Sequence, residues 1–207
     1  MRLKQMRIPT FDLDVLYGKE ALFVVELNFD YIERLHHSSN RTCCQNLAEL
    51  DLSFNRWTEV DLSLINRLRA LKKLRFSSNK IAELNGSLEL PLLIELDLSS
   101  NRFQKIDLCH WNIQSLIDLN MANNQLDHMP NCIEKLKNLM TIRLPDNLLI
   151  ELDFAPFAEI AILYLDFSRN RIKAVQNHHV LSQESCLVMQ GNPISNSSYI
   201  CIGKALN

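Results

Sequence analysis

Two clusters of histidine and cysteine are the residues of this sequence that come closest to a metal site. In HHSSNRTCC, the imidazoles of His36 and His37 and the thiols of Cys43 and Cys44 are groups that bind zinc. Adjacent ligands fit a tetrahedral site poorly, and the cluster lies between two regular segments, where a solvated loop is the simpler interpretation. The histidine pair of NHHV has no companion at ligand spacing. We therefore expect no metal site.

Other residues that could catalyse a reaction or bind a nucleotide lack the required context. The sequence has four glycines, and none lies in a G-x-x-x-x-G-K or G-x-G-x-x-G frame that would cradle phosphate. No serine or cysteine stands in a recognisable nucleophile motif. A formal net charge of −2 without basic runs argues against a nucleic-acid surface. We expect a protein without cofactor that is not an enzyme.

An internal repeat organises the sequence. The stretch LIELDLSSNRF follows the frame L-x-x-L-x-L-x-x-N, and so do LAELDLSFNRW, LKKLRFSSNKI, LIDLNMANNQL, LMTIRLPDNLL and ILYLDFSRNRI. Weaker copies lie at both ends. The asparagine place recurs every 22 to 25 residues, at Asp30, Asn55, Asn79, Asn101, Asn124, Asn147, Asn170 and Asn192. A unit of this length cannot bury its own leucines, so the period indicates a solenoid of stacked coils.

The frame also predicts how each coil is built. Alternation turns the second and third apolar residues inward from a short strand, so that pairs such as Leu96 and Leu98 form the core. Trp57 and Phe103, shortly after their asparagines, are expected in the core as well. The asparagine ends the strand, and its buried amide can satisfy backbone groups of its own and the adjacent coil. Asp30 offers only an acceptor.

With these in-register copies, the sequence resembles the leucine-rich repeat proteins, in their classes with short or typical repeats. The resemblance implies an α/β fold: a right-handed solenoid with a concave parallel β-sheet, and loops and short helices on the convex side. We expect a single domain over residues 1–207. Residues 1–20 would be an N-terminal cap, 21–194 about eight repeats, and 195–207 a C-terminal cap.

The cysteines bear on the compartment. Extracellular members of this family usually carry disulfide-rich caps, whereas the six cysteines here form no cluster at either end. The C-terminal GNPISNSSYICIGKALN loosely resembles the helical cap of cytosolic members. No membrane segment or classical secretory signal is predicted. We therefore expect reduced cysteines and a cytoplasmic protein, or one exported without a classical signal peptide.

Three glycosylation triplets, at Asn40, Asn85 and Asn196, are evidence for the opposite interpretation. They weigh little, because about two such triplets are expected by chance in a chain so rich in asparagine, serine and threonine.

The outward residues of the predicted strands are the candidate binding site. They form columns that are mostly acidic, interrupted by a basic band, with aromatic residues at the strand ends. One interpretation is a self-compensated charge ladder, and the other is a surface that selects a partner protein of complementary charge, with aromatic anchors. The predicted partner-binding residues are Glu26, Phe29, Glu49, Asp51, Phe54, Lys73, Arg75, Glu95, Asp97, Asp118, Arg143, Tyr164 and Asp166.

The favoured function is a non-catalytic protein-binding module, such as a scaffold or adaptor, that uses the concave face. Two alternatives remain open. One is a secreted or cell-surface recognition protein of innate-immunity type, suggested by the units LDLSFN and LDLSSN, which oxidised Cys186 and Cys201 would favour. The other is a bacterial effector that binds a host protein.

Overall fold

The second apolar residue of each repeat lies at the centre of a short strand, and these strands pair in register along the molecule. The computed structural model describes residues 1–4, 8–28, 31–39, 44–194 and 200–201. The central residues of the paired strands form one line through the core, running Leu50, Leu74, Leu96, Leu119, Ile142, Leu165 and Leu187. The expected solenoid is therefore confirmed.

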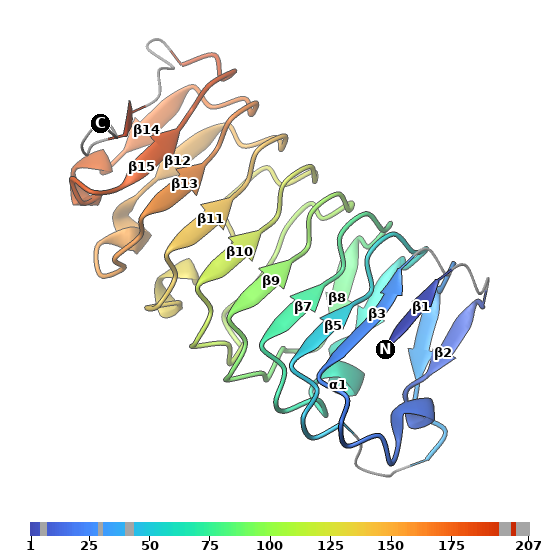
Figure 1. Cartoon of the computed structure of the whole chain (residues 1–207). Helices are drawn as coiled ribbons and strands as arrows, with labels where there is room; N and C mark the ends of the chain where they lie inside the picture. The colour runs from blue at the N-terminus through green and yellow to red at the C-terminus, as the bar shows by residue number, and fades with distance from the viewer. Residues whose placement is uncertain (5–7, 29–30, 40–43, 195–199, 202–207) are drawn as a thin grey trace, which may run out of the picture.

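Within the described residues, ten strands form one long sheet. All neighbours are parallel except the last pair, β15 and β16, which is antiparallel. Figure 1 shows this long sheet in front, with the chain winding coil by coil from the N-terminus to the C-terminus. In spatial order its strands are β1 (Arg2–Lys4), β3 (Val24–Asn28), β5 (Glu49–Asp51), β7 (Lys73–Arg75), β9 (Glu95–Asp97), β10 (Asp118–Asn120), β11 (Thr141–Arg143), β13 (Tyr164–Asp166), β15 (Cys186–Val188) and β16 (Ile200–Cys201).

The opposite, convex side consists of shorter elements. Three two-stranded parallel sheets pair β2 (Thr10–Asp12) with β4 (Arg34–His36), β6 (Glu59–Asp61) with β8 (Glu83–Asn85), and β12 (Glu151–Asp153) with β14 (Ala174–Gln176). The helices are short: α1 (Leu62–Ile65) and the 3₁₀ helices η1 (Leu13–Leu16), η2 (Ile133–Lys135), η3 (Ala155–Phe157) and η4 (His178–Val180). Aspartates begin two of them, because Asp12 and Asp61 each accept a hydrogen bond from the backbone N–H two residues on.

The asparagine of each repeat ties two coils together. The Oδ1 atom of Asn101 accepts from Ile81 N of the preceding coil at 3.0 Å, and its Nδ2 atom donates to Phe76 O of that coil at 2.9 Å. The same amide nitrogen lies 3.1 Å from Leu98 O in its own coil. The pattern recurs at Asn55, Asn79, Asn124, Asn147, Asn170 and Asn192. The predicted role of the asparagine is confirmed there; Asp30 lies outside the described residues.

The residue before each of these asparagines lies in the left-handed region of the backbone. Its φ is +57° at Phe54, +56° at Asp146 and +52° at Arg169, and the last copy has Gly191 at +80°. Left-handed backbone costs an L-residue about 1 kcal/mol or more. The hydrogen bonds between the asparagine amide and the backbone of the preceding coil offset this cost, because the turn places the amide within reach of that backbone.

Aromatic residues fill the core between the long sheet and the convex side. Trp57 and Phe103 are both buried, as predicted. Trp57 meets Phe76 edge-on, with ring centroids 6.1 Å apart. Further along, Phe154 packs against Phe167, with centroids 6.0 Å apart. One hydrophobic cluster runs without interruption from Phe11 to Met189.

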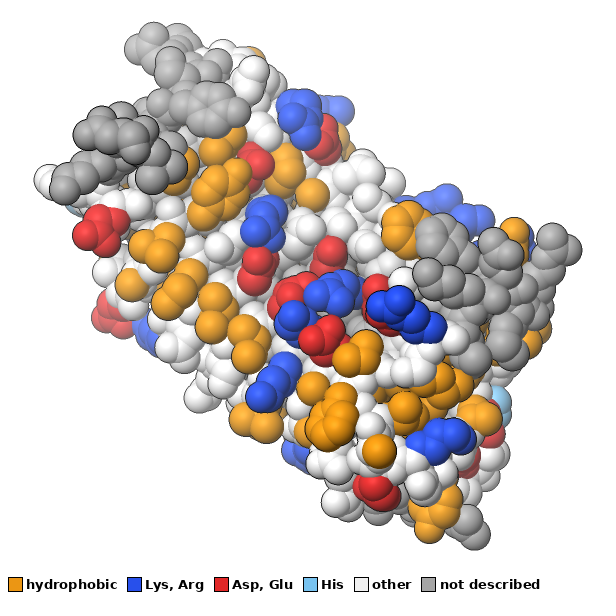
Figure 2. All heavy atoms as spheres, viewed as in Figure 1, with side chains coloured by type: hydrophobic (Ala, Val, Ile, Leu, Met, Phe, Trp, Pro, Cys, Tyr) orange, Lys and Arg blue, Asp and Glu red, His pale blue; other side chains and the backbone are white. Residues whose placement is uncertain are grey.

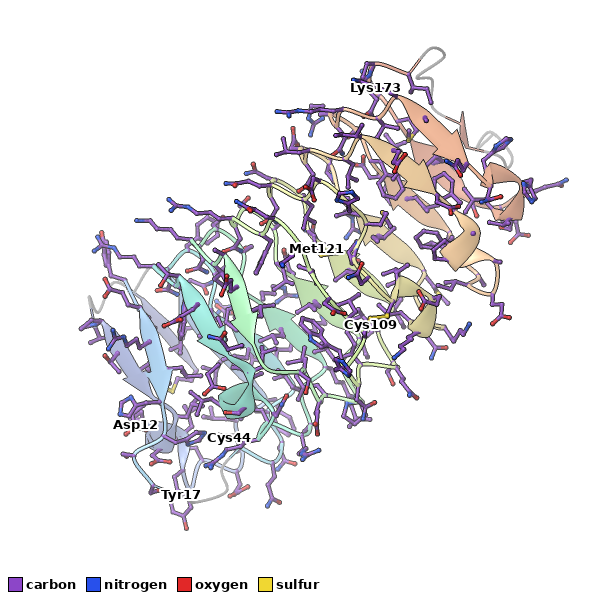
Figure 3. The ribbon with its side chains drawn as sticks, turned by 180° about the vertical axis from the view of Figure 1, so that it is seen from behind. Asp12, Tyr17, Cys44, Cys109, Met121 and Lys173 are labelled. Atoms are coloured by element: carbon purple, nitrogen blue, oxygen red, sulfur yellow. A yellow bond between two sulfur atoms is a disulfide. The ribbon has the colours of Figure 1, made fainter. Side chains whose placement is uncertain are left out.

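The expectation of reduced cysteines is wrong for four described residues. Cys109 and Cys132 form a disulfide, with Cα atoms 5.0 Å apart, on the convex side of two adjacent coils. Figure 3, which views the molecule from behind, shows the bond next to the label of Cys109. Cys44 and Cys186 are also disulfide-bonded. The spacing of the cysteines did not indicate the Cys109–Cys132 pair, because the two residues are 23 positions apart in the sequence, which is one repeat.

Replacing Asn101 with alanine tests the asparagine network. The variant leaves buried backbone groups of two coils without partners, each at about 1–3 kcal/mol, so we expect the free energy of unfolding to fall by about 3 kcal/mol. Asn101→Asp keeps the acceptor for Ile81 N. Its free energy of unfolding should therefore lie between those of Asn101→Ala and the wild type. The control is Asn112→Ala on the exposed surface, expected to change stability by less than about 0.5 kcal/mol. Urea unfolding measures all four proteins, and equal stabilities would contradict the network's role.

The Cys109–Cys132 bond predicts a second loss of stability. Closing a loop of 23 residues reduces the entropy of the unfolded chain, which corresponds to about 3 kcal/mol. The double variant Cys109→Ser/Cys132→Ser should therefore unfold at lower urea concentration under oxidising conditions. If the bond does not form in solution, wild type and double variant will have the same unfolding midpoint.

Candidate functional site

The outward face of the long sheet carries nearly all of the residues that the sequence singled out. In β5, β7, β9, β10, β11 and β13 the central residue is buried and the residues on either side are half-buried. The structure brings onto this face Glu26, Glu49, Asp51, Lys73, Arg75, Glu95, Asp97, Asp118, Arg143, Tyr164 and Asp166. Phe54 follows β5 at the turn and is 48% exposed. Phe29 lies outside the described residues.

Basic residues in the middle of this face are paired with carboxylates of both neighbouring strands. The Arg75 guanidinium lies 2.7 Å from Glu95 and 3.9 Å from Glu49. Lys73 lies between the same two carboxylates, at 3.9 Å and 3.5 Å. We call Glu49, Lys73, Arg75 and Glu95 the charge cluster. Figure 2 shows blue and red side chains interleaved over the middle of the face.

Two more ion pairs follow the same rule along the sheet. Arg143 donates to Asp118 at 2.6 Å, and Arg2 lies 2.8 Å from Glu26. The interpretation of a self-compensated charge ladder therefore describes these contacts, and each exposed pair is worth little stability. These charges on the face are therefore already paired and held in place.

Three of the predicted acidic residues also have a structural task. Asp51, Asp97 and Asp166, the last residues of their strands, each accept a hydrogen bond at 2.9 Å from the serine N–H two residues on. Asn120 accepts from Ala122 N in the same way at 3.1 Å. These bonds shape the turn that leads to the buried asparagine. One oxygen of each carboxylate is therefore engaged with the backbone.

A row of apolar residues on this face was missed by the sequence analysis. Ile94, Ile117, Met140 and Leu163 each stand directly before a strand of the long sheet, and we call them the apolar column. Their backbones are linked from coil to coil, since Ile117 N donates to Ile94 O, Met140 N to Ile117 O, and Leu163 N to Met140 O, each at 2.9 Å. Met140 and Leu163 are each 43% exposed.

The apolar column runs beside the charged middle of the face, where Figure 2 shows a row of hydrophobic side chains. Towards the N-terminus, Lys72 occupies the equivalent place and interrupts it, and Phe23 occupies it again in an earlier coil. The signal was present in the repeat frame, at the position after its first leucine. It was overlooked because only the outward residues of the predicted strands were considered, and the column residues stand just before the strands.

The histidines of the first cluster pair with aspartates. His37 Nδ1 lies 3.2 Å from Asp14 Oδ1, and His36 Nε2 lies 3.6 Å from Asp12 Oδ2. Burial acts to raise the pKa of Asp14, but hydrogen bonds from Ser38, His37 and Ser39 outweigh it and hold that pKa well below its usual range. Cys44 is disulfide-bonded and offers no thiolate, and Cys43 lies outside the described residues.

Among the described residues, one group has metal-binding side chains within reach of one another: Asp107, Cys109 and Cys132. The two sulfur atoms are bonded to each other, so neither is a thiolate ligand. Asp107 is therefore the one member of this group that keeps a ligand atom.

Comparison with known proteins agrees with this architecture. A sequence model of the family described as leucine rich repeat matches residues 45–103. Together with the solenoid of parallel strands, this match identifies a leucine-rich repeat fold, and residues 45–103 are the part that the family model covers. One relative is the leucine-rich repeat-containing G-protein coupled receptor 5 of Rattus norvegicus. It is 38% identical to the present chain over 82 residues, which cover 39% of this chain and 9% of the receptor.

Two solved structures show the same fold. Human 5T4, also called trophoblast glycoprotein, has a TM-score of 0.72 at 19% identity, covering 93% of this leucine-rich repeat chain and 76% of 5T4. Toll, in its Drosophila complex with Spatzle, has a TM-score of 0.66 at 20% identity, covering 92% of this chain and 30% of the Toll chain. The present chain thus spans only a small part of the receptor and of Toll, and these identities establish the fold alone.

One carboxylate at the turn edge predicts a pH dependence. The Arg169 guanidinium donates to both oxygens of Asp146, at 2.6 and 2.5 Å, and this hydrogen bonding lowers the pKa of Asp146 below its ordinary value. The pair therefore adds stability at pH values above about 4, the pKa range of a free aspartate, and loses it as the pH falls through the lowered pKa.

Asp146→Asn should thus be less stable than the wild type at pH 7, by at most about 1 kcal/mol because the pair is exposed. The difference should shrink towards zero in strong acid. Urea unfolding at several pH values measures it, with Glu33→Gln as control for the loss of one exposed carboxylate. A difference that is independent of pH would rule out the ion pair as its cause.

Proposed function

We propose that this leucine-rich repeat protein binds a partner protein through the outward face of its long sheet. The observation that carries the proposal is the apolar column. Four large apolar side chains on four consecutive coils lie side by side on one surface. Isolated apolar residues on a protein surface are ordinary, whereas a contiguous row beside polar groups is typical of an interaction site.

The arrangement suits a partner that lays apolar side chains along the column. Consecutive coils place the column residues at the spacing of parallel strands, about 4.8 Å, and the backbone ladder fixes them before binding. A rigid surface loses little conformational entropy in the complex. The partner's apolar residues would gain burial against Met140 and Leu163, which are the most exposed members of the column.

In this proposal the charge cluster supplies selectivity. Because Arg75 and Lys73 are already compensated by Glu49 and Glu95, the cluster offers little net attraction. A partner with matching polar groups can extend this network, while one with a misplaced charge leaves a group unpaired. The proposed site thus keeps the residues predicted from the sequence and adds the apolar column, with Phe54 and Tyr164 as aromatic contacts.

The second proposal concerns the compartment. Disulfides persist where the surroundings are oxidising and are rare in the cytosol. The Cys109–Cys132 bond and the bonded state of Cys186 therefore favour the secreted or cell-surface recognition protein over a cytoplasmic adaptor. The expectation of a cytoplasmic protein depended on reduced cysteines. Within the described ranges, no helix is both long and apolar enough to cross a bilayer.

We also propose that residues 1–207 form one domain. The N-terminal residues support this, because β1 pairs with β3 and β2 with β4 in the same parallel register as later coils. Leu13 and Leu16 join the common core. In this proposal the N-terminal cap is an irregular first coil. The expected C-terminal cap over 195–207 lies almost entirely outside the described residues.

Charge substitution in the apolar column tests the binding site. The variant Met140→Glu/Leu163→Glu places carboxylates in the column, and Ile150→Glu is the matched control, because Ile150 is 50% exposed but lies outside the long sheet. Each protein is used to capture partners from cell-surface and secreted proteins of the source organism. We expect a partner retained by wild type and control but bound at least about tenfold more weakly by the double variant, a difference of about 1.4 kcal/mol.

Surface plasmon resonance on the captured protein gives the affinities, and circular dichroism shows whether each variant is folded. Equal affinity of the double variant and the wild type would place the partner elsewhere on the solenoid and contradict the proposal.

A further inference from the structure

Asn85 differs from the asparagines that hold the coils together. Those amides are buried against backbone groups. Asn85, in contrast, is the last residue of β8 on the convex side and is an exposed residue. Within the described part of the chain, no hydrogen bond engages its amide. It begins the triplet Asn85-Gly86-Ser87, which has the acceptor pattern for N-linked glycans. The position thus combines an acceptor sequence with an accessible amide.

The backbone around the triplet keeps it accessible. Gly86 has a φ of +92°, and nothing lies within 4 Å of the place where a Cβ would stand, so the chain turns away from the strand in open space. Asn66 Nδ2 then donates to Ser87 O at 2.9 Å and anchors the chain after the turn. Among the described residues, β8 pairs with β6 alone, so the strand that ends at Asn85 has one unpaired edge.

Asn85 also borders two grooves of the convex side. One, of about 560 Å³, is lined by charged residues that include Arg56, Glu59 and Lys80. The other, of about 490 Å³, is lined by residues that include Arg102 and Asp107. Such side chains bind hydroxyl and amide groups of sugars by hydrogen bonds. Sugar units attached to Asn85 would have room and polar partners on either side.

We propose that Asn85 is an N-glycosylation site of this protein. Nδ2 of Asn85 forms a bond to C1 of the first sugar of a lipid-linked oligosaccharide, and the bond from C1 to the pyrophosphate oxygen breaks. The lipid pyrophosphate leaves with the bonding electron pair, and one amide proton is released. The inference rests on the proposed oxidising compartment, where disulfides form and such donors act, and it does not depend on the partner-binding site.

The position of the glycan accords with binding on the other side. β8 belongs to the convex side, behind the long sheet in Figure 1. A glycan there enlarges the polar surface of the convex grooves and leaves the apolar column uncovered.

Peptide mapping of the protein captured from its source cells tests the proposal. Enzymatic removal of N-glycans converts a glycosylated asparagine to aspartate, which mass spectrometry distinguishes in the peptide that contains residue 85. The same peptides, prepared without reduction, show whether Cys109 and Cys132 are bonded. We expect aspartate at position 85 after deglycosylation, together with the disulfide-linked peptides.

Secreted recombinant variants supply the controls. Asn85→Gln and Ser87→Ala should each lose the glycan at this site, and Ser87→Ala does so with the acceptor amide intact. Asn112→Gln, which changes an exposed convex asparagine outside any triplet, should keep it. Site-specific mapping separates this signal from the triplets at Asn40 and Asn196.

The outcomes separate the two proposals. An unmodified Asn85 in a native protein whose disulfide is formed would overturn the glycosylation site and leave the oxidising compartment in place. An unmodified Asn85 with freely alkylated cysteines would overturn both.

Discussion

The amide of the repeat asparagine is the interaction on which this solenoid depends. A coil of 22 to 25 residues must turn sharply after its strand, and the turn leaves backbone groups pointing into the interior. One primary amide forms hydrogen bonds with the backbone of both coils, because it carries donors and an acceptor on a short side chain. Asn101, for example, bonds to Phe76 and Ile81 of one coil and to Leu98 of its own. The leucine columns can stack only when these polar groups are satisfied.

Other features of the molecule follow from that turn. The left-handed residue before each asparagine, Phe54 and Arg169 among them, is where the backbone reverses. Asp51, Asp97 and Asp166, which end their strands, accept hydrogen bonds from the backbone that leads into this turn. Part of the acidity on the long sheet therefore has a structural role, which a neutral amide also fills at Asn120. The side chains of the apolar column carry no polar group that could hold this turn, and this contrast supports the proposed binding site.

The sequence predicted the repeating part of the structure well, because its signal is periodic. The solenoid, the strand positions, the buried asparagines and the core positions of Trp57 and Phe103 all followed from the frame. What it missed depends on contacts between coils. Cys109 and Cys132 look scattered along the chain, yet stacking places residues one period apart next to each other. Similarly, Ile94 and Met140 become a surface only when their separate coils are stacked in register. The charges of the site could be listed from the sequence, but their pairing could not.

The Cys109–Cys132 bond lies in the middle of an array in which each coil touches mainly its neighbours. Arrays of this kind lose structure progressively from their ends, since a terminal coil can detach without breaking contacts further inside. A covalent link between two central coils prevents this fraying from separating the two halves. Ile94 and Ile117 belong to the two linked coils, and Met140 directly follows the second of them. The centre of the proposed binding surface would therefore stay assembled even while the outer coils open and close.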